Sequence, residues 1–436
     1  MPERQKIIGE IKIDELTIDD VKREVKNVPD YKAKIEKCIN KKPTDLLEII
    51  FTGAIFLNAS DIHIEPEEER AKFRLRIDGV LQDVLYFQLK KYQTLLSRIK
   101  LLAGLKLNVY DRPQDGRFSI LVEDTSIEIR ASSLPSEYGE SIVLRLLNPK
   151  NLINLEDLGL RKDLEEIFKR EIKRPNGMII ITGPTGSGKT TTLYAVLKKI
   201  NSPEIKIITI EDPIEYHLEG VSQTQVDKSK GYTFATGLRS IMRQDPDVIL
   251  VGEIRDLETA EIALQAALTG HLVFSTLHTN DAAGAIARLI DLGTRPVSIA
   301  PALNMVVAQR LPRRVCKKCV EFVSPSKETL EKIKKELKNV PEKILPVPFS
   351  KLKSVKIPKV RGCKDCNYTG YKGRIGIFET FLVDDEMERF ILSSPSISAM
   401  RDLAIKKGML LMKTDGLIKV LQGITTIEEV ERVAGE

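Results

Sequence analysis

One octapeptide limits the possible folds of this 436-residue chain more than any other feature. Residues 183–190 read GPTGSGKT, a glycine-rich loop that ends in lysine and threonine. The apolar run MIIIT, at residues 178–182, precedes the loop, and a helical pattern over residues 189–200 follows it. A strand, such a loop and a helix in this order indicate a phosphate-binding P-loop. Without the strand and the helix, a plain glycine turn would be the alternative.

The residue types of the loop suit phosphate binding for separate reasons. Glycines let backbone amides curl around phosphate oxygens, and the N-terminus of the following helix adds a positive potential. Lys189 is expected to reach the β- and γ-phosphates, and the Thr190 hydroxyl to coordinate Mg²⁺. We therefore predict a nucleotide site formed by Gly183, Pro184, Thr185, Gly186, Ser187, Gly188, Lys189, Thr190 and Thr191.

Apolar runs and helical patterns continue to alternate after the loop. Further strands are expected at KIITI, DVILV and LVFSTL, and helices over residues 258–268 and 282–292. Strands that alternate with helices indicate a parallel sheet whose two faces are covered. The sequence thus predicts an α/β P-loop core over residues 161–312.

Two strands of this core end in carboxylates, where an open parallel sheet places its ligand chemistry. Glu211 follows KIITI, and Glu253 follows DVILV. In a P-loop enzyme such groups hold Mg²⁺, directly or through water, and orient the attacking water. Capping of the next helix is the structural alternative, and the pattern does not divide the catalytic roles between the two glutamates. Asp245 and Asp247 precede the strand and are assigned to its turn.

Two of the four histidines, His271 and His278, bracket the run LVFSTL. A metal site would need further ligands, and none is patterned nearby. We interpret the pair as polar sensors of the γ-phosphate near the end of the sheet. A core or loop histidine without a catalytic role is the alternative.

A smaller α+β domain is expected before the core, over residues 43–148. A helical pattern follows Pro43, and apolar residues alternate with charged ones in KFRLRIDGVL and again over residues 125–132. A second helix is expected over residues 93–104. Residues 1–42 are charged and weakly patterned, which suggests a short helical arm, and residues 149–160 form the expected linker.

Four of the five cysteines fall into two Cys-x-x-Cys pairs. Four thiolates are the ligand count of a closed structural zinc site, with ligands Cys316, Cys319, Cys363 and Cys366. A helix over residues 327–339 would fill the long separation between the pairs. Disulfides and metal-free thiols are the alternatives. The site would hold together a small subdomain, residues 313–380, with no part in hydrolysis, and residues 381–436 are expected to be helical.

Charge and hydropathy exclude some function classes. The chain has 68 basic and 62 acidic residues and only 5% aromatic residues, which argues against nucleic-acid binding. The N-terminus lacks the apolar stretch of a signal peptide, and no apolar run approaches the roughly 20 residues of a membrane helix. Any membrane association is therefore expected to come through partner proteins.

Several longer segments match one protein family. GPTGSGKTTTLY, ITIEDPIEY, LRSIMRQDPDVILVGEIRD and TGHLVFSTLHTNDA resemble, in this order, the Walker A, Asp box, Walker B and His box of type II secretion and type IV pilus-assembly ATPases. SDIHIEP, FRLRIDGVL, RPQDGRFSI and LPSEYGESIVLRLL resemble the PAS-like N-terminal domain of that family. The cysteine module followed by GYKGRIGIFE also fits, so the resemblance runs from about residue 43 to the end.

This resemblance implies a RecA-like core, ATP, Mg²⁺ and Zn²⁺ as ligands, and a homo-hexameric ring at the cytoplasmic face of the inner membrane. It also implies that arginines of the first domain approach the γ-phosphate; the matching positions are Arg76, Arg117 and Arg130, with Arg112 and Arg145 as weaker candidates. Residues 1–42 are shorter than the further N-terminal domain through which the family commonly docks on an inner-membrane partner.

The expected function is an ATPase motor that powers assembly of a secretion pseudopilus or a type IV pilus, with inner-membrane platform proteins as partners. A pilus-retraction motor is the nearest alternative, but such motors lack the four-cysteine module. A nucleic-acid translocase is the alternative from another class.

Overall fold

The computed structural model describes residues 9–435, in which two structural units are distinguished. The first unit contains the described residues 9–151 together with Cys316–Val320 and Val360–Lys372. The second unit contains Leu152–Val315, Glu321–Lys359 and residues 373–435.

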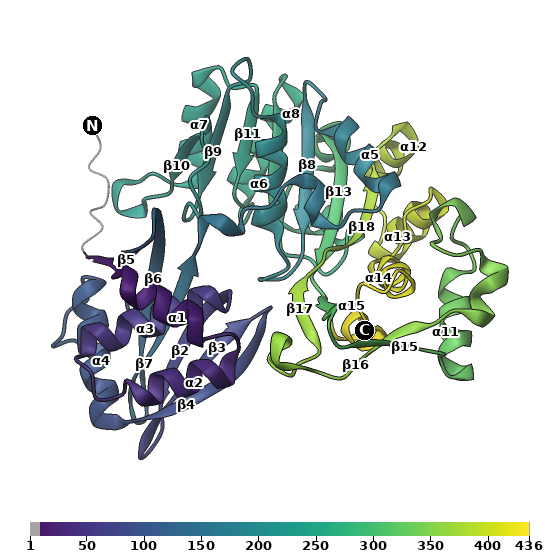
Figure 1. Cartoon of the computed structure of the whole chain (residues 1–436). Helices are drawn as coiled ribbons and strands as arrows, with labels where there is room; N and C mark the ends of the chain where they lie inside the picture. The colour runs from purple at the N-terminus through teal and green to yellow at the C-terminus, as the bar shows by residue number, and fades with distance from the viewer. Residues whose placement is uncertain (1–8, 436) are drawn as a thin grey trace. The chain divides into compact units, whose positions relative to one another are not determined.

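A seven-stranded sheet organises the first unit, in the order β1-β5-β6-β7-β2-β3-β4 (Figure 1). Its neighbouring strands are antiparallel, except that β1 runs parallel to β5. The strands are β1 (Glu10–Lys12), β2 (Ala59–Pro66), β3 (Arg70–Ile77), β4 (Val80–Gln88), β5 (Gln114–Val122), β6 (Thr125–Ser136) and β7 (Gly139–Leu147).

The helices of this unit and one face of its sheet share a single core. Phe73, Leu75 and Ile77 are buried, whereas the intervening Arg74 and Arg76 are partly exposed, which confirms the predicted alternation. A period of two places the apolar residues of a strand on one face. The helices are α1 (Glu15–Glu24), α2 (Val28–Lys37), α3 (Pro43–Phe56) and α4 (Leu89–Leu102).

Residues 10–38 differ from the arm that the sequence predicted. They form β1, α1 and α2, and the side chains of Ile11, Ile18 and Ile35 lie in the same core as the sheet. This segment has few apolar residues among its charged ones. Even so, α1 packs against α3, and β1 pairs with β5. Residues 10–38 therefore contribute to the core of the first unit.

The second unit is built on a sheet in the order β10-β9-β11-β12-β8-β13-β18. Neighbouring strands are parallel from β10 to β13, and β18 is antiparallel to β13, which confirms the predicted parallel sheet. The strands are β8 (Gly177–Thr182), β9 (Ile207–Glu211), β10 (Ser222–Gln225), β11 (Val248–Val251), β12 (Leu272–Leu277), β13 (Leu303–Arg310) and β18 (Ile377–Leu382).

Helices cover both faces of this sheet. Met178 and Ile180 of β8 belong to one core cluster, whereas Ile179 and Ile181 belong to another, as expected for a strand buried on both sides. The helices are α5 (Lys162–Glu171), α6 (Lys189–Ile200), α7 (Phe234–Ile241), α8 (Leu257–Leu268), α9 (Ala283–Asp291), α10 (Pro296–Ile299), α12 (Asp385–Leu392), α13 (Ile397–Lys406), α14 (Met412–Leu421) and α15 (Ile427–Ala434).

A buried ionic cluster attaches the start of α5 to the C-terminal helices. Asp415 is fully buried, and its carboxylate lies 2.8 Å from Arg161 Nη1 and 2.7 Å from Lys419 Nζ. The backbone amide of Phe378 donates to Asp415 Oδ2 at 2.8 Å. Burial alone would raise the pKa of Asp415, but the charges of Lys419 and Arg161 hold it below its usual value. The carboxylate is therefore charged and paired.

The cysteine-containing segment carries α11 (Lys327–Leu337), which confirms the helix predicted between the cysteine pairs. Ile333 and Leu337 of α11 pack with Leu417 and Ile418 of α14. Four short strands complete the segment, namely β14 (Arg313–Val315), β15 (Val320–Val323), β16 (Ile357–Val360) and β17 (Tyr371–Arg374). Within residues 9–435, no helix combines the length and the apolar character needed to cross a membrane.

Candidate nucleotide site and cysteine cluster

The predicted phosphate loop joins β8 to α6 at the carboxyl edge of the second-unit sheet. Gly183 and Gly188 have φ values of 154° and 87°, in the region that glycine adopts without a steric cost. A Cβ atom on Gly183 would lie 2.8 Å from the carbonyl oxygen of Gln309, and one on Gly188 would lie 2.9 Å from Leu311 Cδ1. Both positions therefore require glycine.

Lys189 begins α6 and turns back over the loop. Its Nζ donates hydrogen bonds to the carbonyl oxygens of Gly183, at 2.7 Å, and Pro184, at 3.2 Å. Burial lowers the pKa of Lys189 to about 8, while the Glu253 carboxylate opposes this change and the Arg310 guanidinium adds to it. The ammonium group is thus held over the loop in a site that favours an anion beside it.

The Ser187 hydroxyl is another polar group in the loop. Its Oγ is buried and has no hydrogen-bond partner among residues 9–435. Buried polar groups are normally hydrogen-bonded, so this hydroxyl suits a polar ligand at the loop. Together with the backbone shape and Lys189, it makes the loop fit a nucleotide phosphate.

Glu253 and His278 lie close to Lys189. Glu253 follows β11 and is partly exposed; its Oε1 lies 2.5 Å from Arg255 Nη2, and its Oε2 lies 3.5 Å from His278 Nε2. Burial and then the Lys189 charge lower the pKa of His278, and the Glu253 carboxylate acts in the opposite direction. The structure thus brings together a cation, a carboxylate and an imidazole at the carboxyl ends of β8, β11 and β12.

Glu211 has a different environment from Glu253. It is the last residue of β9 and is only 4% exposed. Tyr194 donates to its Oε2, whereas Thr209 Oγ1, at 2.5 Å, and Gln223 Nε2, at 3.2 Å, donate to its Oε1. Burial raises the pKa of Glu211 in spite of these hydrogen bonds. Both oxygens of this carboxylate therefore already accept hydrogen bonds from neighbouring side chains.

The predicted arginines of the first unit come from three strands. Arg76 lies on β3, Arg117 on β5 and Arg130 on β6, and all three are partly exposed. Arg76 Nε is 3.4 Å from Asp61 Oδ2. Arg130 Nε is 3.1 Å from Glu128 Oε1. Their positions place them on the face of the sheet opposite its apolar core.

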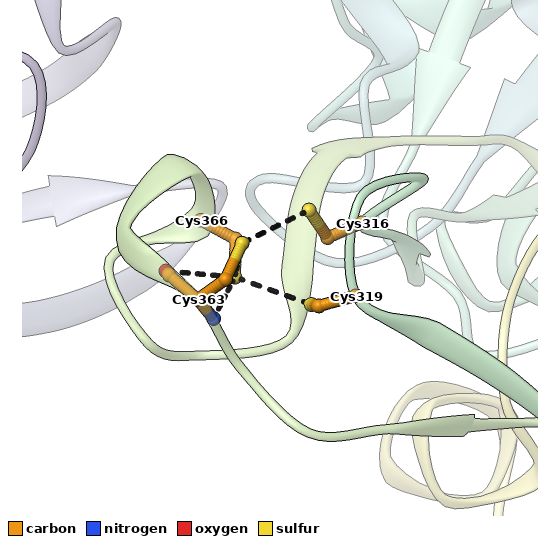
Figure 2. Close-up of side chains that lie close together, drawn as sticks. All are labelled: Cys316, Cys319, Cys363 and Cys366. Carbon is orange, nitrogen blue, oxygen red and sulfur yellow. Dashed lines mark hydrogen bonds between the residues drawn. The ribbon is translucent and has the colours of Figure 1, made fainter.

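Figure 2 shows the four cysteine side chains pointing toward one another from two loops. Their sulfur atoms all lie within 4.8 Å of one another. The separations are 3.9 Å for Cys316 and Cys363, 3.8 Å for Cys319 and Cys366, and 3.7 Å for Cys363 and Cys366. Tetrahedral zinc with Zn–S bonds of about 2.3 Å requires sulfurs about 3.8 Å apart. The cluster therefore fits a zinc site.

Backbone amides support the same cluster. The amides of Cys363, at 3.1 Å, and Gly370, at 3.2 Å, donate to the sulfur of Cys366. Hydrogen bonds of this kind stabilise and orient a metal-binding thiolate.

The model of one protein family, described as type II/IV secretion system protein, matches residues 39–432. The chain belongs to this family. The match covers most of both structural units, including the phosphate loop and all four clustered cysteines.

Curated relatives of this secretion-family chain are ATPases of secretion and pilus systems. It is 47% identical over 393 residues to the type II secretion system ATPase E of Vibrio cholerae, covering 90% of this chain and 75% of that protein. It is 41% identical over 427 residues to the type IV pilus assembly ATPase PilB of Thermus thermophilus, covering 98% of this chain and 46% of that protein.

Solved structures support the fold. The ATPase DotB of Legionella pneumophila aligns with a TM-score of 0.64 at 22% identity, covering 91% of this chain and 98% of that one. The pilus retraction motor PilT, solved with bound ADP, aligns with a TM-score of 0.58 at 26% identity, covering 89% and 96%.

His271, one of the predicted site residues, lies away from the phosphate loop. His271 precedes β12, whose first residue, Leu272, pairs with Gly177 at the amino end of β8; the loop follows Thr182 at the other end. Its Nδ1 lies 3.0 Å from the Ala266 carbonyl oxygen. The expectation that His271 senses the γ-phosphate is thus corrected, because a strand of six residues separates the two histidines along the sheet.

Arg310 is a residue near the loop that the sequence did not reveal. It ends β13, the strand beside β8, and its charge contributes to the lowered pKa of Lys189. Its guanidinium donates to the carbonyl oxygens of Gln309, at 3.0 Å, and Asn280, at 2.7 Å. The apolar run before Arg310 would have indicated a strand, but not that this strand adjoins the loop.

Proposed function

We propose that this chain is a hexameric motor ATPase that hydrolyses ATP at the phosphate loop and powers assembly of a type II secretion pseudopilus or a type IV pilus. The observation that carries the proposal is the grouping of Lys189, Glu253 and His278 beside a glycine loop with a buried, unpartnered hydroxyl. The names of relatives at 41–47% identity supply the biological process.

In this mechanism, the loop amides and Lys189 bind the β- and γ-phosphates. Thr190 would hold Mg²⁺, which neutralises charge on the transferred phosphate. Glu253 orients the attacking water, since its partly exposed carboxylate lies near Lys189. His278 contacts Glu253 and senses the terminal phosphate. Glu211 supports the strand end, because its oxygens already accept hydrogen bonds from the protein.

Arginines 76, 117 and 130 would bind the terminal phosphate in the assembled enzyme. A guanidinium keeps its charge and grips two phosphate oxygens at once. We further propose that the second unit has a RecA-like core and that the first unit is PAS-like, and that residues 313–380 form a zinc subdomain. The geometry of the four sulfur atoms supports zinc as the bound metal.

The proposed partners are further copies of the chain and the inner-membrane platform proteins of a secretion or pilus machine, at the cytoplasmic face of the membrane. Retraction is not favoured, because relatives named for secretion or pilus assembly are 41–47% identical, against 26% for the retraction motor. Nucleic-acid translocation has no support among these relatives.

A complementation experiment tests this function. A strain lacking the gene is supplied with the wild-type chain or with Lys189→Ala, and surface filaments and secreted protein are quantified. The wild-type chain should restore one of these two outputs, and Lys189→Ala should restore neither at equal expression. Restoration of either output by Lys189→Ala to the wild-type level would contradict the proposal.

A further inference from the structure

The turn after β12 carries His278 beside the phosphate loop, and a threonine at the end of β8 contacts the chain on both sides of this histidine. Thr182 is the last residue of β8 and pairs with Leu277, the last residue of β12. Its Oγ1 lies 3.1 Å from the Leu277 carbonyl oxygen, and the Thr279 backbone amide donates to the same Oγ1 at 2.9 Å. One hydroxyl thus contacts the residue before His278 and the residue after it.

A second hydroxyl extends these contacts into the turn. Thr182 Oγ1 and Thr279 Oγ1 lie 2.7 Å apart, and Thr279 Oγ1 donates to the Asp281 carbonyl oxygen at 2.8 Å. A hydroxyl has a single proton to donate. Because Thr279 donates its proton to Asp281, the Thr182 hydroxyl is the donor between the two threonines. Hydrogen bonds therefore run in one chain from the end of β8 to the turn after His278, and bonds in such a chain strengthen one another.

Thr182 and His278 differ in their exposure to solvent. Thr182 is fully buried, whereas the side chain of His278 is 49% exposed. An exposed side chain loses conformational entropy when it is held in one place, so its backbone must be fixed by other residues. Gly183, the first residue of the phosphate loop, directly follows Thr182. The same buried threonine therefore joins the phosphate loop to the segment that carries His278.

Other residues anchor the remainder of the turn. Arg310 donates to the Asn280 carbonyl oxygen at 2.7 Å. The backbone amide of Ala282, at the start of α9, donates to Oε1 of the buried Glu379 at 3.0 Å. Loss of the Thr182 hydroxyl therefore leaves the start of α9 in place and affects mainly the segment around His278.

We propose that Thr182 is a positioning residue that fixes His278 relative to the phosphate loop during ATP hydrolysis. The inference rests on the proposed function and adds Thr182, with Thr279 as its hydrogen-bond partner, to the residues that support turnover. Thr182 acts through the backbone on either side of His278, without a contact of its own to the phosphates. Polar groups fixed before the reaction stabilise developing charge without reorganisation, so displacement of His278 lowers turnover.

Thr182→Val and Thr182→Ser test the proposal on the full chain. Valine keeps the shape of threonine without the hydroxyl, whereas serine keeps the hydroxyl. We expect kcat for Mg·ATP hydrolysis to fall about tenfold in Thr182→Val and to stay within about threefold of the wild type in Thr182→Ser. The Kd for ADP, measured by calorimetric titration, should stay within about twofold in both variants, because the loop amides and Lys189 remain. Wild-type kcat in Thr182→Val would overturn the inference, as would equal losses of kcat in the valine and serine variants.

The same substitution in a His278→Ala background separates positioning of the histidine from a general structural effect. Residues that act as a unit have non-additive effects on turnover. His278→Ala retains Lys189 and Glu253, so single-turnover measurements should detect slow hydrolysis. If Thr182 acts through His278, Thr182→Val should lower this residual rate by less than about twofold. An equal fold loss with and without His278 would show that Thr182 does not act through the histidine.

Thr224→Val is the matched control. Thr224 lies on β10 of the same sheet, where β9, β11 and β12 separate it from β8. Its Oγ1 donates to the Thr209 carbonyl oxygen of β9 at 2.8 Å, so the substitution also removes a hydrogen bond between neighbouring strands. The kcat of Thr224→Val should stay within about twofold of the wild type. An equal loss of kcat in Thr224→Val and Thr182→Val would overturn the inference, because the loss would then be common to such hydroxyls.

Thr279→Val decides the question if Thr182→Val does not fold. Valine at this position removes the second hydroxyl but keeps the backbone amide that donates to Thr182, so kcat should fall while the Kd for ADP stays unchanged. Wild-type kcat in Thr279→Val would then overturn the inference. Failure of the proposed function has a different sign, namely that the wild-type chain itself does not hydrolyse ATP.

Discussion

Glu253→Gln should reduce kcat for ATP hydrolysis by at least about a hundredfold. The carboxylate is partly exposed, interacts electrostatically with Lys189 and lies 3.5 Å from His278 Nε2, so it can orient a water beside the phosphate loop. Glutamine keeps the shape but cannot accept a proton. The Kd for a nonhydrolysable ATP analogue should change little, since the phosphates are bound by the loop. Steady-state turnover and analogue titration measure these effects.

Glu211→Gln is the matched comparison for this prediction. Glu211 is buried and accepts hydrogen bonds from Tyr194, Thr209 and Gln223. Its amide variant should lose about 1–3 kcal/mol of stability, because buried partners become unsatisfied. Its kcat should stay within about tenfold of the wild type. If Glu211→Gln loses more turnover than Glu253→Gln, the assignment of the water-orienting role to Glu253 is wrong.

Removal of the four-cysteine cluster should have the second large effect. The purified wild-type chain should contain one zinc per chain by elemental analysis, whereas the double variant Cys316→Ser, Cys363→Ser should contain less than about a tenth of that amount. Binding of a structural zinc contributes about 10–16 kcal/mol in small zinc domains, so its loss should unfold this segment locally. Hydrogen exchange should show lost protection at the amide of Cys316, which donates to the Gly370 carbonyl at 2.8 Å.

Cys38→Ser is the control for the metal measurement. Cys38 is buried in the first-unit core and is not part of the cluster. This variant should keep the full zinc content even if its stability falls. Equal zinc in the double variant and the wild type would show that the metal lies elsewhere.

The sequence predicted those helices, strands and loops that depend on residues close to one another along the chain. The phosphate loop, the helix that begins at Lys189 and the strands of the parallel sheet follow from glycine geometry and from runs of apolar residues. The four cysteines were identified from ligand count, and their sulfurs lie at the spacing that zinc requires.

Long-range pairing determined what the sequence did not reveal. Arg310 lies by the loop because β13 inserts beside β8, and no local signal specifies that neighbour. His271 and His278 flank β12, and both were predicted to sense the γ-phosphate. They lie at opposite ends of this strand, and His271 is at the end away from the phosphate loop. Asp61 and Arg145 form an ion pair only because two strands distant in the sequence, β2 and β7, are neighbours in register. The burial of Glu211 likewise depends on Tyr194 and Gln223 from other elements.

The most direct test of the central claim is the rate of Mg²⁺-dependent ATP hydrolysis by the purified wild-type chain and by Lys189→Ala. Circular dichroism and the thermal midpoint establish that both are folded, and removal of a buried cation whose pKa is lowered to about 8 should not destabilise the ligand-free fold. The account predicts turnover by the wild type and none above background by Lys189→Ala. Undiminished turnover in the folded Lys189→Ala variant would contradict it.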